Sequence, residues 1–123
     1  VEHGGKVTYE SFSALRVTDR YRSLNPSIET RAIKVNLRRL DTILAEHAAD
    51  VETIEILTID VEGWELGVLE GLSLQRYKPA VIVLENLLDD EGYRVYMREH
   101  GYRLHLGMNP NEIYVPIAAS MSR

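Results

Sequence analysis

The sequence contains no cysteine. Disulfide bonds, thiolate metal sites and cysteine nucleophiles are therefore excluded, because each of them requires a cysteine sulfur. Small proteins of oxidising compartments commonly depend on disulfides, and nothing in this sequence indicates such a compartment. We therefore expect a cytoplasmic protein.

Positive charge is also scarce. The chain has 14 Lys and Arg against 19 Asp and Glu, which gives a formal net charge of -5. Proteins that bind nucleic acid neutralise its phosphates with clustered Lys and Arg, so we expect no nucleic-acid partner. The longest apolar runs have the length of a β-strand, and no basic leader followed by an apolar run opens the chain. This predicts neither a membrane partner nor a secretion signal.

The length of 123 residues fits one domain rather than two. Residues 1–31 are polar and irregular, whereas residues 32–123 carry the periodic patterns of an α/β domain. The first residue is Val1 rather than Met. We therefore expect either a processed chain or a piece of a longer protein.

Residues 54–65 are the stretch around which the rest of the chain is organised. An apolar run with β-branched residues ends at Asp60, a break follows at residues 60–63, and a helical apolar pattern begins. A second apolar run, residues 80–84, ends at Glu85. Strands that are apolar on both faces are normally covered by helices on both sides, which predicts a mostly parallel sheet in an α/β domain.

Other local patterns predict the remaining elements. They are a half-exposed strand over residues 33–37, a helix capped by Asp41, a helix stop at Gly71 in a left-handed conformation, a helix that begins at Asp89 or Asp90 and ends at Gly101, and an antiparallel hairpin of strands 102–106 and 113–117.

Asp60 and Glu85 are the candidate catalytic residues. Ligands of such sheets bind beyond the carboxyl ends of the strands, and neighbouring parallel strands would bring both acids to one crevice. The alternative is a structural role, since either acid could cap a helix or order a loop. Glu62 and Glu65 lie near the first turn of the next helix, where the helix dipole stabilises negative charge.

Several motifs occur in the order found in one protein family. They are residues 35–41 (VNLRRLD), 59–65 (IDVEGWE), 68–71 (VLEG), 79–85 (PAVIVLE), 101–102 (GY) and 111–114 (NEIY). Over about residues 32–116 the sequence resembles the carboxyl-terminal half of FkbM-type S-adenosylmethionine-dependent methyltransferases.

The resemblance implies a Rossmann-like class I methyltransferase sheet, mostly parallel and ending in an antiparallel hairpin. It also implies transfer of a methyl group from S-adenosylmethionine to an oxygen of a small-molecule acceptor, such as a sugar or a polyketide. In such a site Asp60 and Glu85 would act in catalysis, and Asp60 could also bind Mg²⁺. Glu62 and Gly63 would contact the cofactor.

The sequence departs from the family at the cofactor loop. It contains no G-x-G-x-x-G motif, and its closely spaced Gly63, Gly67 and Gly71 all follow the Asp60 strand. We therefore expect residues 32–123 to be the carboxyl-terminal half of the domain, inactive alone and partnered by the missing amino-terminal half or by another copy in a homo-oligomer. The alternative is a non-catalytic α/β module that associates through its open sheet edge.

Overall fold

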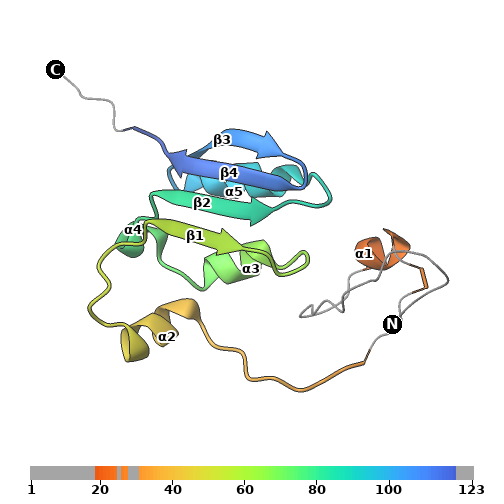
Figure 1. Cartoon of the computed structure of the whole chain (residues 1–123), viewed down its shortest axis with the longest axis horizontal. Helices are drawn as coiled ribbons and strands as arrows, with labels where there is room; N and C mark the ends of the chain where they lie inside the picture. The colour runs from red at the N-terminus through yellow and green to blue at the C-terminus, as the bar shows by residue number, and fades with distance from the viewer. Residues whose placement is uncertain (1–18, 25, 28–30, 119–123) are drawn as a thin grey trace, which may run out of the picture.

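The fold is a mixed α/β arrangement in which a four-stranded sheet carries helices (Figure 1). The computed structural model describes residues 19–24, 26–27 and 31–118, so most of the predicted irregular segment 1–31 lies outside the described residues. None of the described helices is long and apolar enough to span a membrane. In chain order the elements are α1 (Asp19–Leu24), α2 (Leu40–His47), β1 (Ile56–Ile59), α3 (Glu65–Glu70), α4 (Leu74–Tyr77), β2 (Val81–Glu85), α5 (Glu91–Glu99), β3 (Tyr102–Met108) and β4 (Asn111–Pro116).

The sheet has the strand order β1-β2-β4-β3. Strands β1 and β2 are parallel and are connected through α3 and α4, and β3 and β4 form an antiparallel hairpin, so both of these predictions are confirmed. The prediction of a mostly parallel sheet is wrong for the described residues. Strand β4 turns back from β3 and pairs with β2 in the antiparallel sense, which leaves β1–β2 as the parallel pairing.

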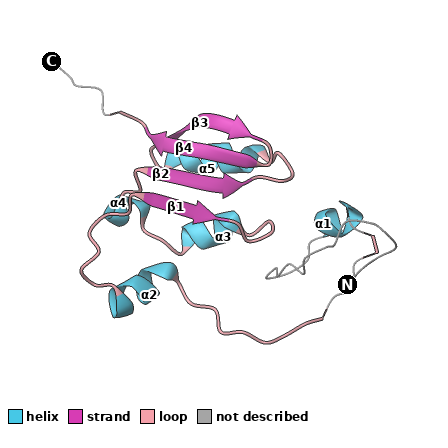
Figure 2. Cartoon of the chain, viewed as in Figure 1, coloured by secondary structure: helices cyan, strands magenta, loops and turns pink. Residues whose placement is uncertain are grey.

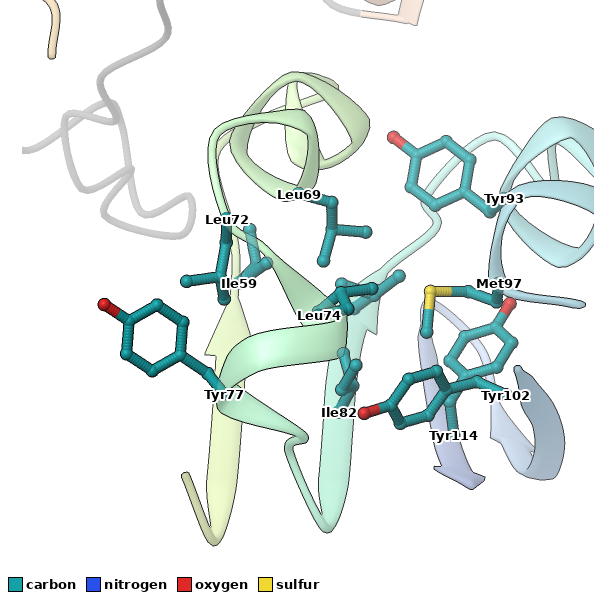
Figure 3. Packing of buried hydrophobic residues seen from close by; sticks show 11 residues of the cluster. Ile59, Leu69, Leu72, Leu74, Tyr77, Ile82, Tyr93, Met97, Tyr102 and Tyr114 are labelled. Carbon is teal, nitrogen blue, oxygen red and sulfur yellow. The ribbon is translucent and has the colours of Figure 1, made fainter. Parts of the chain in front are cut away.

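The core lies between one face of the sheet and helices α3, α4 and α5 (Figures 2 and 3). The burial pattern of β2 indicates that only one face of the sheet is fully covered. Its alternate residues Ile82 and Leu84 are fully buried, while their neighbours along the strand are half-buried. The buried apolar residues are Ile59, Leu69, Leu72, Leu74, Tyr77, Ile82, Leu84, Tyr93, Met97, Tyr102 and Tyr114.

The opposite face of the sheet carries no helix within the described part of the chain (Figure 1). The side chain of Ile56 in β1 is 66% exposed, and Thr58 on the same face is also exposed. The expectation of a central strand buried on both faces is therefore wrong here. Strand β1 is also an edge strand, since its described neighbour lies on one side only.

The predicted strand over residues 33–37 is not formed. These residues run outside the sheet with exposed side chains, and Ile33 and Leu37 are each 71% exposed. The alternation of apolar and polar residues is present, but a strand also needs a neighbouring strand to pair with its backbone. The described residues provide no such neighbour for this segment.

Asp41 joins two helices instead of capping one. Residue Arg39 occupies the cap position of α2, and its side chain makes no capping hydrogen bond. The Asp41 carboxylate accepts a 2.8 Å hydrogen bond from the backbone N–H of Ser73, and the backbone N–H of Asp41 donates to the carbonyl oxygen of Gly71 at 2.9 Å. The predicted cap is therefore wrong, and Asp41 holds α2 against the turn between α3 and α4.

Gly71 is required for close packing rather than for a left-handed backbone. Its φ angle of -84° is open to any residue, so the predicted left-handed conformation is wrong. A Cβ atom at this position would lie 3.2 Å from the carbonyl oxygen of Val68 and 3.4 Å from the backbone nitrogen of Leu40. The glycine lets the start of α2 approach the end of α3.

We predict that Gly71→Ala lowers the free energy of unfolding by about 1 to 3 kcal/mol, because both crowded neighbours are backbone atoms that cannot move away freely. Gly67→Ala is the matched control within α3, where the new Cβ would lie 3.6 Å from the Trp64 ring, an ordinary contact. Since alanine favours helix over glycine, this control should be neutral or stabilising by up to about 1 kcal/mol. Urea denaturation measures both variants, and equal stabilities would contradict the packing role of Gly71.

Candidate active site at the ends of two parallel strands

Three carboxylates meet where β1 and β2 end. The register pairs Ile59 with Leu84, so the next residues lie side by side, Asp60 just after β1 and Glu85 as the last residue of β2. One carboxylate oxygen from each of Asp60, Glu62 and Glu85 lies within 4.8 Å of the others. Asp60 is exposed, whereas Glu62 and Glu85 are half-buried. The prediction that Asp60 and Glu85 come together at one edge of the sheet is confirmed, and the crevice and their catalytic role stay predictions.

The turn that follows β1 has an unusual backbone. Glu62 has a φ angle of 56° and Gly63 one of 93°, so two consecutive residues are left-handed. A Cβ atom on Gly63 would meet no atom within 4 Å. Backbone conformation, rather than lack of space, therefore favours glycine at this position.

A buried glutamate holds this turn in place. Glu65 is 0% exposed, and its Oε1 atom accepts hydrogen bonds from the backbone N–H groups of Val61 at 2.9 Å and Gly63 at 3.2 Å. Its Oε2 atom accepts a 2.5 Å hydrogen bond from the hydroxyl of Tyr93 in α5. One carboxylate thus connects the turn, the start of α3 and α5.

This role of Glu65 was missed from the sequence, where the residue is only a favourable acid at a helix start. The spacing between Glu65 and the apolar residues that follow it is the signal that could have revealed this role. Glu65 lies four residues before Leu69 and seven before Leu72, both of which are buried. A carboxylate on the apolar stripe of a helix is expected to be buried and hydrogen-bonded.

The loop after β2 is ordered by Asn86, which is 4% exposed. Its side-chain oxygen accepts from the backbone N–H of Asp90 at 2.8 Å, and its side-chain nitrogen donates to the carbonyl oxygen of Asp90 at 3.1 Å. The Asp90 carboxylate accepts a 2.9 Å hydrogen bond from the backbone N–H of Gly92. Of the two predicted caps for α5, Asp90 is therefore the correct one, and Asp89 has a left-handed φ of 49° instead.

The pKa of the Glu85 carboxyl is raised to about 7, chiefly by burial and in addition by the negative charges of Asp60, Glu62 and Glu65 and a hydrogen bond with Asp60. Burial also raises the pKa of the Tyr93 hydroxyl, with the hydrogen bond to Glu65 as the next cause. A carboxyl group with a pKa near 7 can both hold and release a proton at neutral pH. Glu85 is thus suited to proton transfer at this edge of the sheet.

The three carboxylates fit a hard divalent cation. Mg²⁺ prefers oxygen ligands and is usually bound by one or two carboxylates, and Asp60, Glu62 and Glu85 offer oxygens close to one another. A cation there would supply positive charge beside a bound hydroxyl group. The predicted role of Asp60 as a metal ligand stays a prediction.

The pH dependence of stability should report on Glu85. Between its ordinary pKa of 4.5 and the folded value of about 7, the folded state binds more protons than the unfolded chain. The free energy of unfolding should therefore fall as the pH rises through this interval. We predict that Glu85→Gln removes this fall and stabilises the protein at about pH 8 by roughly 1 to 2 kcal/mol, less than the full linkage value because solvent reaches the half-buried carboxyl.

Urea denaturation across the pH range measures this effect. Glu55→Gln is the matched control, since it removes the same charge from an exposed position just before β1. Parallel stability curves for the wild type and Glu85→Gln would contradict the raised pKa of Glu85.

The family comparison identifies the family of this chain. The model of the family described as Methyltransferase FkbM domain matches residues 2–104, from near the first residue into β3. No curated protein and no solved structure matches the chain. Because the match covers most of the sequence, the chain belongs to the FkbM methyltransferase domain family.

Proposed function

We propose that this chain is the carboxyl-terminal half of an S-adenosylmethionine-dependent methyltransferase that methylates a hydroxyl oxygen of a small-molecule acceptor. Family membership indicates methyl transfer in general. The convergence of Asp60, Glu62 and Glu85 at the ends of β1 and β2 is the observation that carries the finer proposal. It provides acids at the sheet edge where α/β proteins of this type bind their ligands. A cytoplasmic location and a Rossmann-like class I fold belong to the same proposal.

The described residues fit the cofactor only in part. Gly67 lies within α3 and Gly71 packs against the start of α2, so neither belongs to a loop that could cradle a ligand. Of these glycines, only Gly63 lies at the strand ends, next to Glu62 in the left-handed turn. We propose that Glu62 and Gly63 contact the cofactor and that the remaining contacts come from an amino-terminal half or from another chain. The isolated 123-residue chain is then inactive.

Within this proposal Glu85 takes the proton of the acceptor hydroxyl. The acceptor oxygen forms a bond to the methyl carbon while the carbon–sulfur bond of the donor breaks, and the hydroxyl proton passes to the Glu85 carboxylate. Asp60, exposed beside Glu85, orients the hydroxyl by accepting a hydrogen bond. Positioning contributes much of the rate in such a transfer, because the methyl group of S-adenosylmethionine is already activated.

We predict that Glu85→Gln lowers kcat by about 100-fold to 10,000-fold in the complete enzyme, the usual range for loss of a general acid–base group, and that Asp60→Asn, which keeps an acceptor oxygen but removes the charge, lowers kcat less. Asp50→Asn is the matched control, since Asp50 is exposed in the connection between α2 and β1. Release of S-adenosylhomocysteine in the presence of hydroxylated acceptors measures turnover, and the melting temperature checks folding. Near-wild-type turnover in both folded variants would remove the catalytic assignment.

The same assay separates a proton-transfer site from a metal site. Turnover that is unaffected by EDTA supports Glu85 as the proton acceptor without a cation. Complete loss with EDTA and recovery with Mg²⁺ would instead assign the three carboxylates as metal ligands.

A second candidate function is a non-catalytic module that associates with a partner or with another copy of the chain. The exposed face of the sheet around Ile56 and the open edge of β1 favour this candidate. The turnover assay separates the two candidates, because an interaction module gives no methyl transfer whether or not Asp60 is present.

A further inference from the structure

Residues 31–39 (RAIKVNLRR), which we call the basic segment, are exposed along their whole length. Within it Ile33, Val35 and Leu37 alternate with the polar residues Lys34 and Asn36. The segment runs outside the sheet before α2, and no strand of the described part of the chain lies beside it (Figure 1). Alternation with a period of two is typical of a strand with one apolar face. The basic segment therefore has the sequence of a strand and still needs a neighbouring strand.

Strand β1 offers a complementary edge. Within the described residues it pairs with β2 on one side only, so the backbone groups of its other side face outward. On its open face the side chain of Ile56 is 66% exposed, and Thr58 is also exposed. Proteins commonly add a further strand to an open edge of this kind, with main-chain hydrogen bonds providing the affinity.

The basic segment and the β1 region carry opposite charges. The basic segment contains four Lys and Arg residues and no acid, namely Arg31, Lys34, Arg38 and Arg39. Residues 50–62, which include β1, contain five acids and no Lys or Arg, namely Asp50, Glu52, Glu55, Asp60 and Glu62. Glu55 and Asp60 stand directly at the two ends of β1, and Arg31 and Arg38 stand at the two ends of the apolar alternation. These charges match in either strand direction, and such complementarity favours one partner over others.

Contacts with α2 and α3 fix the end of the basic segment within its own copy. Its last residue, Arg39, lies against Gly71, where a Cβ atom on the glycine would be 3.7 Å from the Arg39 Cα. Arg38 forms a 2.5 Å ion pair with Glu46 of α2. From this anchored end the segment runs outside the sheet and does not pair with β1 of the same copy. The same segment of a second copy is therefore the occupant that fits the edge in both pattern and charge.

We propose that two copies of this chain exchange their basic segments, so that residues 33–37 of each copy add a strand to the open edge of β1 in the other. Ile33, Val35 and Leu37 then lie on the same face as Ile56, and apolar neighbours on one face of a sheet stabilise strand pairing. A two-fold axis makes the two contacts identical and closes the assembly as a dimer. The exchange is independent of the proposed methyl transfer, because it uses neither the Glu85 carboxyl nor a cofactor.

Sedimentation equilibrium of the 123-residue chain measures the association. We expect a dimer with a dissociation constant of about 1 to 100 μM, because the paired strands are short and the interface is small. Val35→Asp places an acid opposite the acidic edge and should weaken the dimer at least about tenfold. Raising the salt concentration from about 0.05 M to about 0.5 M should also weaken it, because salt screens exposed charges.

Val95→Asp is the matched control. Val95 is also an exposed valine, but it lies in α5, which packs against β3 at the opposite edge of the sheet from β1. This variant should leave the dissociation constant unchanged. Val35 lies outside the buried core, so a loss of association in Val35→Asp with an unchanged far-ultraviolet circular dichroism spectrum reports on the contact rather than on folding.

The absence of cysteine from the sequence allows the contact itself to be tested. A mixture of Val35→Cys and Thr58→Cys chains, treated with a short bismaleimide, should give a dimer cross-linked between positions 35 and 58, since same-face neighbours on paired strands are close. Val95→Cys in place of Val35→Cys should give no such product.

Four results would overturn the exchange. They are a chain that stays monomeric at millimolar concentration, equal weakening by Val35→Asp and Val95→Asp, cross-linking between two copies at position 58 without the 35–58 product, and a monomeric double variant Val35→Cys/Thr58→Cys that cross-links within one chain. The third result would assign the interface to two β1 edges, and the fourth would assign the edge to the segment of the same copy. Because no methyl transfer is measured, a monomeric chain leaves the proposed function standing, and absence of turnover leaves the exchange standing.

Discussion

The buried carboxylate of Glu65 is the interaction on which the proposed site depends. Removing a charge from water costs several kcal/mol, and this cost must be offset by hydrogen bonds. Glu65 accepts hydrogen bonds from Val61, Gly63 and Tyr93, and a hydrogen bond to a charged group contributes about 1.5 to 3 kcal/mol. These contacts fix the left-handed turn after β1 and connect it to α5. Glu62, within that turn, is thereby held near Asp60 and Glu85, and the charge of Glu65 also helps to raise the pKa of Glu85.

Two consecutive residues where β2 ends, Glu85 and Asn86, point to opposite faces of the sheet. Alternate residues of a strand point to opposite faces, and Asn86 continues the buried series of Ile82 and Leu84 on the helix-covered face. Glu85 belongs to the other series, with Val83 on the open face. The strand end therefore presents the Glu85 carboxyl on one side and, on the other, the Asn86 amide that orders the loop before α5.

The sequence was sufficient to predict the meeting of Asp60 and Glu85, because parallel neighbouring strands bring their carboxyl ends to the same edge. It was also sufficient for the hairpin and for a cap of α5 at Asp89 or Asp90, which depend on local patterns, but it did not choose between these two acids. The prediction of a strand over residues 33–37 was wrong because a strand needs a neighbouring strand to pair with, and the described chain does not supply one. Asp41 was misassigned since Ser73, its partner, lies 32 residues away in the chain. Local patterns do not contain such distant contacts, and for the same reason they did not reveal that Tyr93 binds Glu65.

Amide hydrogen exchange at Val61 and Gly63 tests most directly whether Glu65 holds the turn. Glu65→Gln keeps an acceptor oxygen, whereas Glu65→Leu keeps a side chain of similar size and removes every acceptor. The account predicts that both amides are protected in the wild type and in Glu65→Gln, and exchange at least about tenfold faster in Glu65→Leu while the amides of β2 stay protected. Unchanged protection of Val61 and Gly63 in a folded Glu65→Leu variant, or absence of protection in the wild type, would contradict it.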